Sequence, residues 1–190
     1  MELLKERIRR DGRIKDGHII KVDSFLNHQI DIELMDEIGK EFKRRFDGEN
    51  ITKVITIEAS GIAVACLTAK YFNVPVVFAK KSASKNIDGD VYTTKIVSYT
   101  RGIEYTVMLE KRFLTSDDRI LIIDDILATG KAQLGLLDIS SQAGAIVAGI
   151  GVVIEKGFQG GGDQLRLAGH NLHSLAIIET MENDTLKFRD

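Results

Sequence analysis

The sequence predicts an α/β fold in which helices flank a mostly parallel sheet. Short apolar runs, typical of buried strands, alternate with segments whose apolar residues recur at helical spacing. Four consecutive aliphatic residues, Ile120 to Ile123, are typical of a strand that is buried on both faces. With 190 residues, of which 44% are hydrophobic, the chain can form one well-buried domain.

The first part of the chain predicts two amphipathic helices. The mixed Lys, Arg and Glu residues of 2–15 are typical of a solvated helix with Leu3, Leu4 and Ile8 inward. Asp31 can cap the second helix, because a carboxylate there can accept a free backbone N–H of the first turn. The second helix has four apolar residues on one face: Met35, Ile38, Phe42 and Phe46.

The middle of the chain predicts alternating strands and helices. Pro75 opens a strand, where its missing N–H costs little. Cys66 lies on an apolar helical face with Ile62, Ala69 and Phe72, which predicts a small core residue rather than a reactive thiol. The predicted elements are a strand over 54–57, a helix over 61–72, a strand over 76–79, and a β pair formed by 91–98 and 105–110.

The last part of the chain continues this alternation. The strand at 120–123 precedes a helix, a strand over 145–154, and a helix and β region from Gly157 onward. The glycine-dense stretch 157–163 is interpreted as a connector with Asp163 as the helix N-cap, in preference to a loop that approaches substrate. The helix after the strand has one apolar stripe: Ala132, Leu136, Ile139 and Ala143.

The junction between that strand and helix predicts an anion site. Asp124 and Asp125 end the strand, and we expect their carboxylates to face a polar cleft rather than the core. The small residues 128–132 then open the helix, whose free N–H groups and dipole favour a phosphate, with Thr129 adding a hydroxyl. Carboxylates beside a bound phosphate would repel it, unless they accept hydrogen bonds from a vicinal diol or help to hold Mg²⁺. The alternative interpretation is a solvated acidic turn.

Two other phosphate motifs fail. Gly130-Lys131 resembles the end of a P-loop, but Ala132 follows where Ser or Thr belongs, and Asp125 occupies the position of the first glycine. Gly149-Ile150-Gly151 lies inside a β-like run and lacks the third glycine of a dinucleotide fingerprint. We expect those two glycines to allow close packing.

The segment 120–132 resembles the 5-phosphoribosyl-1-pyrophosphate (PRPP) binding motif of type I phosphoribosyltransferases. That resemblance implies the type I phosphoribosyltransferase fold and assigns the catalytic acidic pair, which holds the ribose diol, to Asp124 and Asp125. It implies Mg²⁺ as a cofactor that is held mainly through PRPP, without a certain protein ligand. The 5′-phosphate would bind five residues of the loop: Ala128, Thr129, Gly130, Lys131 and Ala132.

Two further loops at strand ends match the pyrophosphate contacts of the family. Ala59 and Ser60 lie in a loop whose small residues let backbone N–H groups approach an anion, although a tight turn with a Ser cap is equally open. Lys80 and Lys81 follow the next strand, where a solvated strand exit is the alternative. The polar stretch 82–90, with Ser98-Tyr99-Thr100 beyond it, resembles a mobile hood that closes over the site.

Base recognition is predicted at Lys156, which ends an apolar strand. An ammonium can donate to a keto oxygen but cannot accept from an amino group, so an oxopurine is favoured over adenine. The alternative is a strand-end lysine paired with Glu155. The stretch 20–30 is similar to that of family members that act on xanthine, which implies purine contacts from Asn27 and the backbone of Ile20. Without the resemblance, Asn27 is interpreted as a turn residue. Guanine and hypoxanthine are rival substrates, because one keto contact does not separate oxopurines.

One position departs from the pattern of hypoxanthine-guanine enzymes. They carry an aspartate where this chain has Ala128, so no carboxylate is available there as a general base, and the loop resembles that of adenine enzymes. Because xanthine is acidic, we hypothesise that an anionic substrate needs no such base. A rate that is independent of pH across the ionisation of xanthine would count against this hypothesis.

Composition and the resemblance together set the remaining expectations. A net charge of −2 gives no electrostatic reason to bind nucleic acid, and no signal peptide or membrane-spanning run is seen. One cysteine fits a cytoplasmic protein, and four histidines without ligand spacing predict no structural zinc. The resemblance implies a single domain over 1–190 with a hood from about residues 1–35, a homodimer, and PRPP and xanthine as substrates. A non-catalytic PRPP-sensing regulator is the rival of another class.

Overall fold

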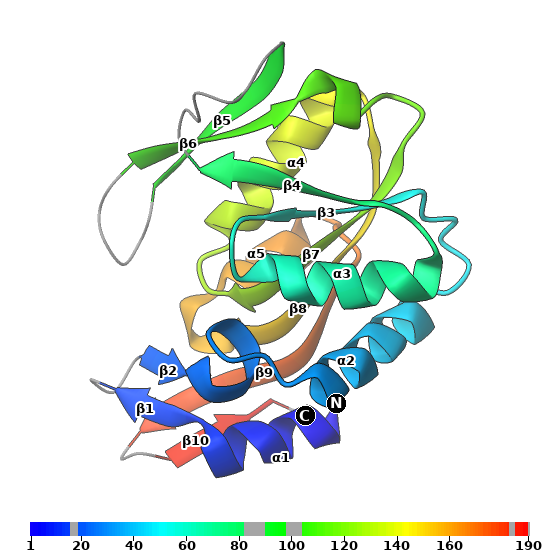
Figure 1. Cartoon of the computed structure of the whole chain (residues 1–190). Helices are drawn as coiled ribbons and strands as arrows, with labels where there is room; N and C mark the ends of the chain where they lie inside the picture. The colour runs from blue at the N-terminus through cyan, green and yellow to red at the C-terminus, as the bar shows by residue number, and fades with distance from the viewer. Residues whose placement is uncertain (16–18, 82–89, 98–103, 183–184, 190) are drawn as a thin grey trace.

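The computed structural model describes residues 1–15, 19–81, 90–97, 104–182 and 185–189. Within them, eight strands form one sheet in the order β10-β9-β8-β7-β3-β4-β6-β5 (Figure 1). Its centre is parallel, and β10, β6 and β5 pair antiparallel at the two edges. The strands are β3 (Lys53–Ile57), β4 (Val76–Lys81), β5 (Val91–Val97), β6 (Glu104–Glu110), β7 (Arg119–Leu127), β8 (Ile146–Lys156), β9 (Leu172–Glu182) and β10 (Thr185–Phe188). The predicted α/β class, with its mostly parallel sheet, is confirmed.

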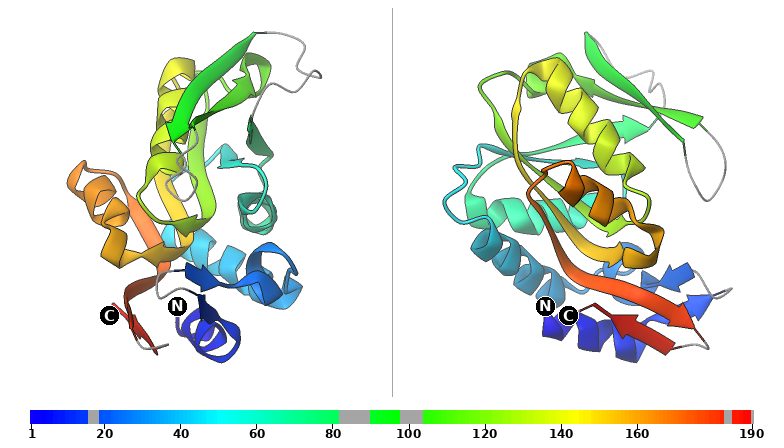
Figure 2. Two further views of the ribbon diagram at one scale, coloured as in Figure 1. Left: turned by 90° about the vertical axis from the view of Figure 1, so that its left-hand side faces the viewer. Right: turned by 180° about the vertical axis from the view of Figure 1, so that it is seen from behind.

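Helices cover both faces of the sheet, as Figure 2 shows in its left view. On one face lie α2 (Ile32–Arg45) and α3 (Gly61–Phe72), and on the other lie α4 (Lys131–Ala143) and α5 (Gly161–Leu167). Each face has its own apolar core, because residues of the buried strands point alternately to the two sides. Leu121 and Ile123 pack on the α2 and α3 side, whereas Ile120 and Ile122 pack on the α4 side.

The N-terminal segment extends the core on the α2 and α3 side. It consists of α1 (Glu2–Asp11), the short antiparallel pair β1 (Arg13–Lys15) and β2 (Ile19–Lys21), and a π-helix at Asp23–Asn27. Two 3-10 helices elsewhere, Lys111–Phe113 and Gly157–Gln159, complete the elements of the described residues. Asp31 caps α2 as predicted, because its Oδ1 accepts the backbone N–H of Leu34 at 3.1 Å.

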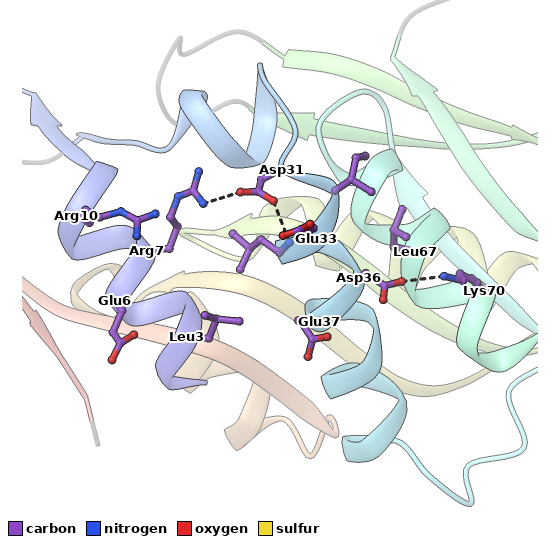
Figure 3. Close-up of a pocket in the computed structure, with 12 residues that line it drawn as sticks. Leu3, Glu6, Arg7, Arg10, Asp31, Glu33, Asp36, Glu37, Leu67 and Lys70 are labelled. Carbon is purple, nitrogen blue, oxygen red and sulfur yellow. Dashed lines mark hydrogen bonds and ion pairs between the residues drawn. The ribbon is translucent and has the colours of Figure 1, made fainter.

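Three predictions about single residues are wrong. Leu3 is 49% exposed and points into the groove between α1 and α2, because the buried stripe of α1 is Leu4 and Ile8, four residues apart (Figure 3). Cys66 is exposed, since α3 turns Val64, Ala65, Thr68 and Ala69 inward. Asp163 lies within α5 rather than capping it, because the N-cap is Gly160, which has a φ of 73°. The first helix also ends at Asp11 rather than at residue 15, where β1 follows.

Candidate functional site

The acidic pair lies on β7, in the middle of the sheet, and the strand continues past it to Leu127. Asp124 and Asp125 point to opposite faces, because successive side chains alternate along a strand. Their exposed fractions are only 8% and 6%, so both side chains are more deeply buried than a position facing an open cleft would imply. Hydrogen bonds compensate this burial, and the partners differ between the two residues.

Asp125 brings together residues from three distant segments. Asn27 Nδ2 donates to Asp125 Oδ2 at 3.1 Å, and Ser60 Oγ donates to Asp125 Oδ1 at 3.0 Å. The two donors come from the N-terminal π-helix and from the loop between β3 and α3. The structure therefore places three predicted site residues, Asn27, Ser60 and Asp125, in direct contact. Ser60 is the N-cap residue of α3, as the alternative interpretation has it, but its side chain makes no cap hydrogen bond to the helix and binds Asp125 instead.

Asp124 faces the other side and is held by a residue that the sequence analysis missed. Gln133 Nε2 donates to Asp124 Oδ2 at 2.8 Å, and the backbone N–H of Asp125 donates to Asp124 Oδ1 at 3.0 Å. Burial, and then the charge of Asp125, raise the pKa of Asp124 well above its ordinary value, while the charge of Lys81 opposes this shift. Asp124 is thus a carboxylate whose ionisation depends on nearby donors.

The predicted phosphate loop lies directly beyond β7. Gly130 adopts a left-handed conformation, with φ 80°, and α4 begins at Lys131 without a side-chain cap from the described residues. Its first N–H groups are therefore available to an anion. Gly161 supports the loop from behind, because a Cβ there would overlap Ala128 O and the Thr129 carbonyl carbon. Ala128 and Thr129 are partly exposed, and Ala132 is half-buried.

The loop after β3 is linked to the end of β4. Glu58 precedes Ala59 through a cis peptide bond, and its Oε1 accepts the backbone N–H of Lys81 at 2.6 Å. Lys81 lies on the same side as Asp124, with its Nζ 5.5 Å from the ring centre of Tyr105. Lys80 points to the opposite face, into a cavity that Phe78 and Phe113 also line. The side chains of Lys80 and Lys81 therefore do not reach the same ligand group.

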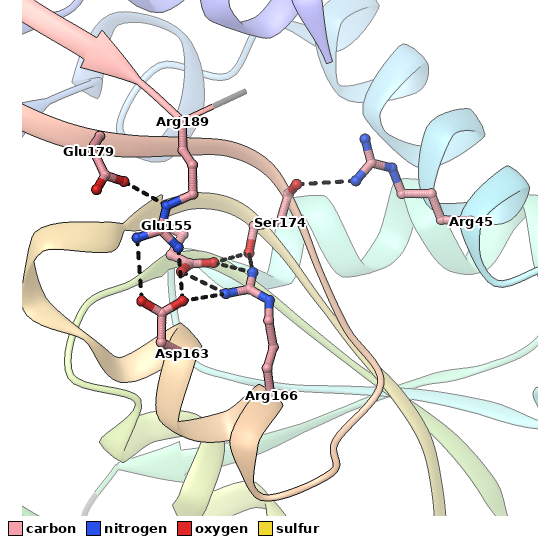
Figure 4. A network of polar contacts seen from close by, with 7 residues as sticks. All are labelled: Arg45, Glu155, Asp163, Arg166, Ser174, Glu179 and Arg189. Carbon is pink, nitrogen blue, oxygen red and sulfur yellow. Dashed lines mark hydrogen bonds and ion pairs between the residues drawn. The ribbon is translucent and has the colours of Figure 1, made fainter.

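The other two predicted base residues come from β2 and from the end of β8. Ile20 is buried in β2, and Lys156 is half-buried at the end of β8, where burial lowers its pKa. The neighbouring Glu155 is fully buried and binds Arg166, with 2.6 Å between Oε2 and Nη2, and also accepts from Ser174. Figure 4 shows this network continuing to Asp163, Glu179 and Arg189. It fixes the strand end that carries Lys156.

Other features of the described residues lie apart from this site. A groove of about 750 Å³ between α1, α2 and α3 is lined by Leu3, Arg7 and Lys70 among others, and by none of the predicted site residues (Figure 3).

In the described part of the chain, no group of three or more His, Cys, Asp or Glu residues could hold a metal ion. No helix there is long and apolar enough to cross a membrane. Residues 82–89 and 98–103, which include most of the predicted closing segment, lie outside the described residues.

Comparison with known proteins identifies the family. A phosphoribosyl transferase domain matches residues 21–163. The chain belongs to the phosphoribosyltransferase family. It is 60% identical to xanthine phosphoribosyltransferase from Lachnoclostridium phytofermentans over 100% of this chain and 98% of that protein. It is 56% identical to the xanthine phosphoribosyltransferase of Ruminiclostridium cellulolyticum over the full length of both.

The fold agrees with this family. The crystal structure of adenine phosphoribosyltransferase from Rhodothermus marinus superposes with a TM-score of 0.76, covering 94% of this chain and 100% of that one. At 21% identity, this likeness concerns the fold alone. The type I phosphoribosyltransferase fold predicted from the motif at 120–132 is therefore confirmed.

Proposed function

We infer that the protein is a xanthine phosphoribosyltransferase, which transfers 5-phosphoribose from PRPP to N9 of xanthine. The products are xanthosine 5′-monophosphate and pyrophosphate, a reaction of purine salvage. The observation that carries this inference is identity of 56–60% over essentially full length with xanthine phosphoribosyltransferases. The contact of Asp125 with Asn27 and Ser60 supports it, since it joins the proposed purine, ribose and pyrophosphate positions.

We propose that the ribose lies over the end of β7. Its hydroxyls would donate to Asp124 and Asp125, because ionised carboxylates are strong acceptors. The 5′-phosphate would bind the free N–H groups at the start of α4, and pyrophosphate would bind near Ala59, Ser60 and Lys81, the last residue of β4. The start of α4, which has no side-chain cap, and the link between Glu58 and Lys81 support this arrangement.

The reaction chiefly requires positioning and charge stabilisation. Departure of pyrophosphate leaves positive charge on the ribose, so groups that bind the leaving phosphates lower the barrier. Mg²⁺ would arrive with PRPP and neutralise pyrophosphate charge, while Asp124 and Asp125 would hold the ribose diol. Lys156 would donate to a keto oxygen of the purine, and Asn27 and the Ile20 backbone would complete the base site.

The same proposal extends to three properties that rest on family membership. We propose a homodimer, a cytoplasmic location, and a single domain over 1–190 in which about residues 1–35 form a hood. The contacts of the N-terminal segment support the last point, because Ile20, Phe25 and Leu26 pack into the same core as α2. This placement brings Asn27 to Asp125.

The decisive assay mixes the protein with PRPP, Mg²⁺ and, separately, xanthine, guanine, hypoxanthine, adenine or orotate, and measures the nucleotide formed. We expect a strong preference for xanthine. Preference for guanine or hypoxanthine would keep the reaction and overturn the base assignment. If folded protein binds PRPP but forms no nucleotide with any base, the enzyme assignment is wrong and a PRPP-sensing regulator replaces it.

A further inference from the structure

Gln133 is a buried polar residue in the first turn of α4. Its exposed fraction is 1%, and its amide donates to Asp124 Oδ2 at 2.8 Å. It lies three residues after Gly130, at the start of the helix that the phosphate loop opens. The contact therefore joins the two halves of the PRPP motif, which are the acidic strand end and the helix N-terminus.

Asp124 lies in a confined site, so its contact with Gln133 affects both its ionisation and its orientation. The charges of the adjacent Asp125 and of Lys81 on β4 act on the Asp124 carboxylate, which in turn acts on the phenol of Tyr105 on β6. Gly61 closes another side, because a Cβ there would lie 3.1 Å from Asp124 Oδ1. A carboxylate in such a confined site needs donors to stay ionised and to hold one orientation.

We propose that Gln133 is a positioning residue for PRPP. Its amide N–H fixes the Asp124 carboxylate in the orientation that accepts a ribose hydroxyl, while the helix that carries Gln133 binds the 5′-phosphate. Gln133 itself does not touch the base. This inference rests on the proposed function, but it concerns PRPP alone and does not depend on which purine is the substrate.

The first test replaces Gln133 with Met, which keeps the length of the side chain and removes the donor. For Q133M we expect PRPP binding, measured by titration calorimetry with Mg²⁺, to weaken roughly tenfold. The KM for PRPP should rise by a similar factor, whereas the KM for xanthine should stay within about twofold. Unchanged PRPP affinity in Q133M, or equal losses for both substrates, would overturn the proposal.

The second test uses Q133E, which replaces the amide with a carboxyl group of the same size. When that carboxyl group is protonated it can donate to Asp124 as the amide does, whereas its ionised form would repel Asp124. The ratio of kcat/KM for PRPP, Q133E over wild type, should therefore fall as pH rises from about 5 to 8. A ratio that does not change with pH would show that Gln133 acts only through packing.

Matched controls exist at the other end of the same helix. Gln142 is exposed and donates to Thr93 O at 2.9 Å and to Asp138 Oδ2 at 3.1 Å. Q142M and Q142E should bind PRPP like wild type at every pH. Circular dichroism of each variant separates loss of fold from loss of binding. Wild type that binds PRPP without forming nucleotide would contradict the proposed function and leave the Gln133 test intact.

Discussion

The two carboxylates near the carboxyl end of β7 are adjacent in sequence and differ in their surroundings. Asp125 points to the face of α2 and α3, where Asn27 and Ser60 bind it from distant segments. Asp124 points to the face of α4, where the partner Gln133 lies only nine residues away. The pair therefore should not be treated as one acidic patch. One carboxylate connects the substrate loops, and the other is confined beside the phosphate loop.

The largest expected effect comes from Asp125→Asn. The change removes the charge that accepts from the ribose, from Asn27 and from Ser60, so we expect kcat/KM for PRPP to fall at least about 100-fold. Stability should change far less, because an amide oxygen can still accept from Ser60. Steady-state kinetics and thermal unfolding measure the two quantities. If D125N lost as much free energy of unfolding as it lost in transition-state stabilisation, calculated from kcat/KM, the assigned role of Asp125 would be contradicted.

Lys156→Met tests the proposed contact between the base site and a keto oxygen of the purine. Loss of a hydrogen bond from a charged donor should raise the KM for xanthine about 10- to 100-fold. The KM for PRPP should stay near the wild-type value. Arg166, which binds Glu155 on the same strand end, offers a control, since Arg166→Lys should change the xanthine KM much less. Equal changes in both KM values for K156M would remove Lys156 from the base site.

Asp124→Asn should separate stability from function. Because the pKa of Asp124 is raised in the folded protein, the folded state binds more protons than the unfolded state above pH 3.8, and stability falls as pH rises through that window. Removing the charge should therefore stabilise the ligand-free protein at pH 7 by on the order of 1 kcal/mol, a few degrees in Tm, while PRPP affinity falls.

The pH series supplies the control for this comparison. The Tm difference between D124N and wild type should shrink as pH falls toward 4. At lower pH a growing fraction of Asp124 is protonated in both the folded and the unfolded states, so the substitution removes less charge. A D124N protein that is less stable than wild type at every pH would show that the charge of Asp124 is not a cost to the fold.

Ser60→Ala should have the smallest effect. It removes one of the two side-chain donors to Asp125, and a single hydrogen bond contributes about 1 kcal/mol. We expect kcat/KM for PRPP to fall about fivefold and Tm to fall by no more than a few degrees. Ser60→Thr keeps the hydroxyl and should retain most of the activity. Full activity in S60A would show that Asp125 is held by Asn27 alone.

Much of the fold could be predicted because its signals are local. The strand over 54–57 and the helix over 61–72 match β3 and α3, since apolar runs and helical periodicity reflect burial directly. The exposure of Cys66 could not be predicted, because α3 is apolar on most sides and the sequence does not fix which side packs. Lys80 and Lys81 were predicted to follow a strand over 76–79, but β4 continues through Lys81, so the two side chains point to opposite faces.

Only part of the candidate site could be predicted from the sequence, because not every site residue carries a recognisable signal. The acidic pair, the loop and Lys156 carry a motif or a resemblance, whereas Gln133 carries neither. A polar side chain three residues before Leu136, on the buried side of a predicted helix, was the available signal. The depth of Asp124 and Asp125 could not be predicted, because it depends on donors from Asn27, Ser60 and Gln133 that only the fold assembles.

The most direct test is a crystal structure with xanthosine 5′-monophosphate bound. We expect the ribose hydroxyls within hydrogen-bond distance of Asp124 and Asp125, the phosphate at residues 128–132, and the base between Asn27 and Lys156. A nucleotide that binds elsewhere, for example in the groove between α1 and α2, or one whose ribose avoids both carboxylates, would contradict the placement of the reaction at the end of β7.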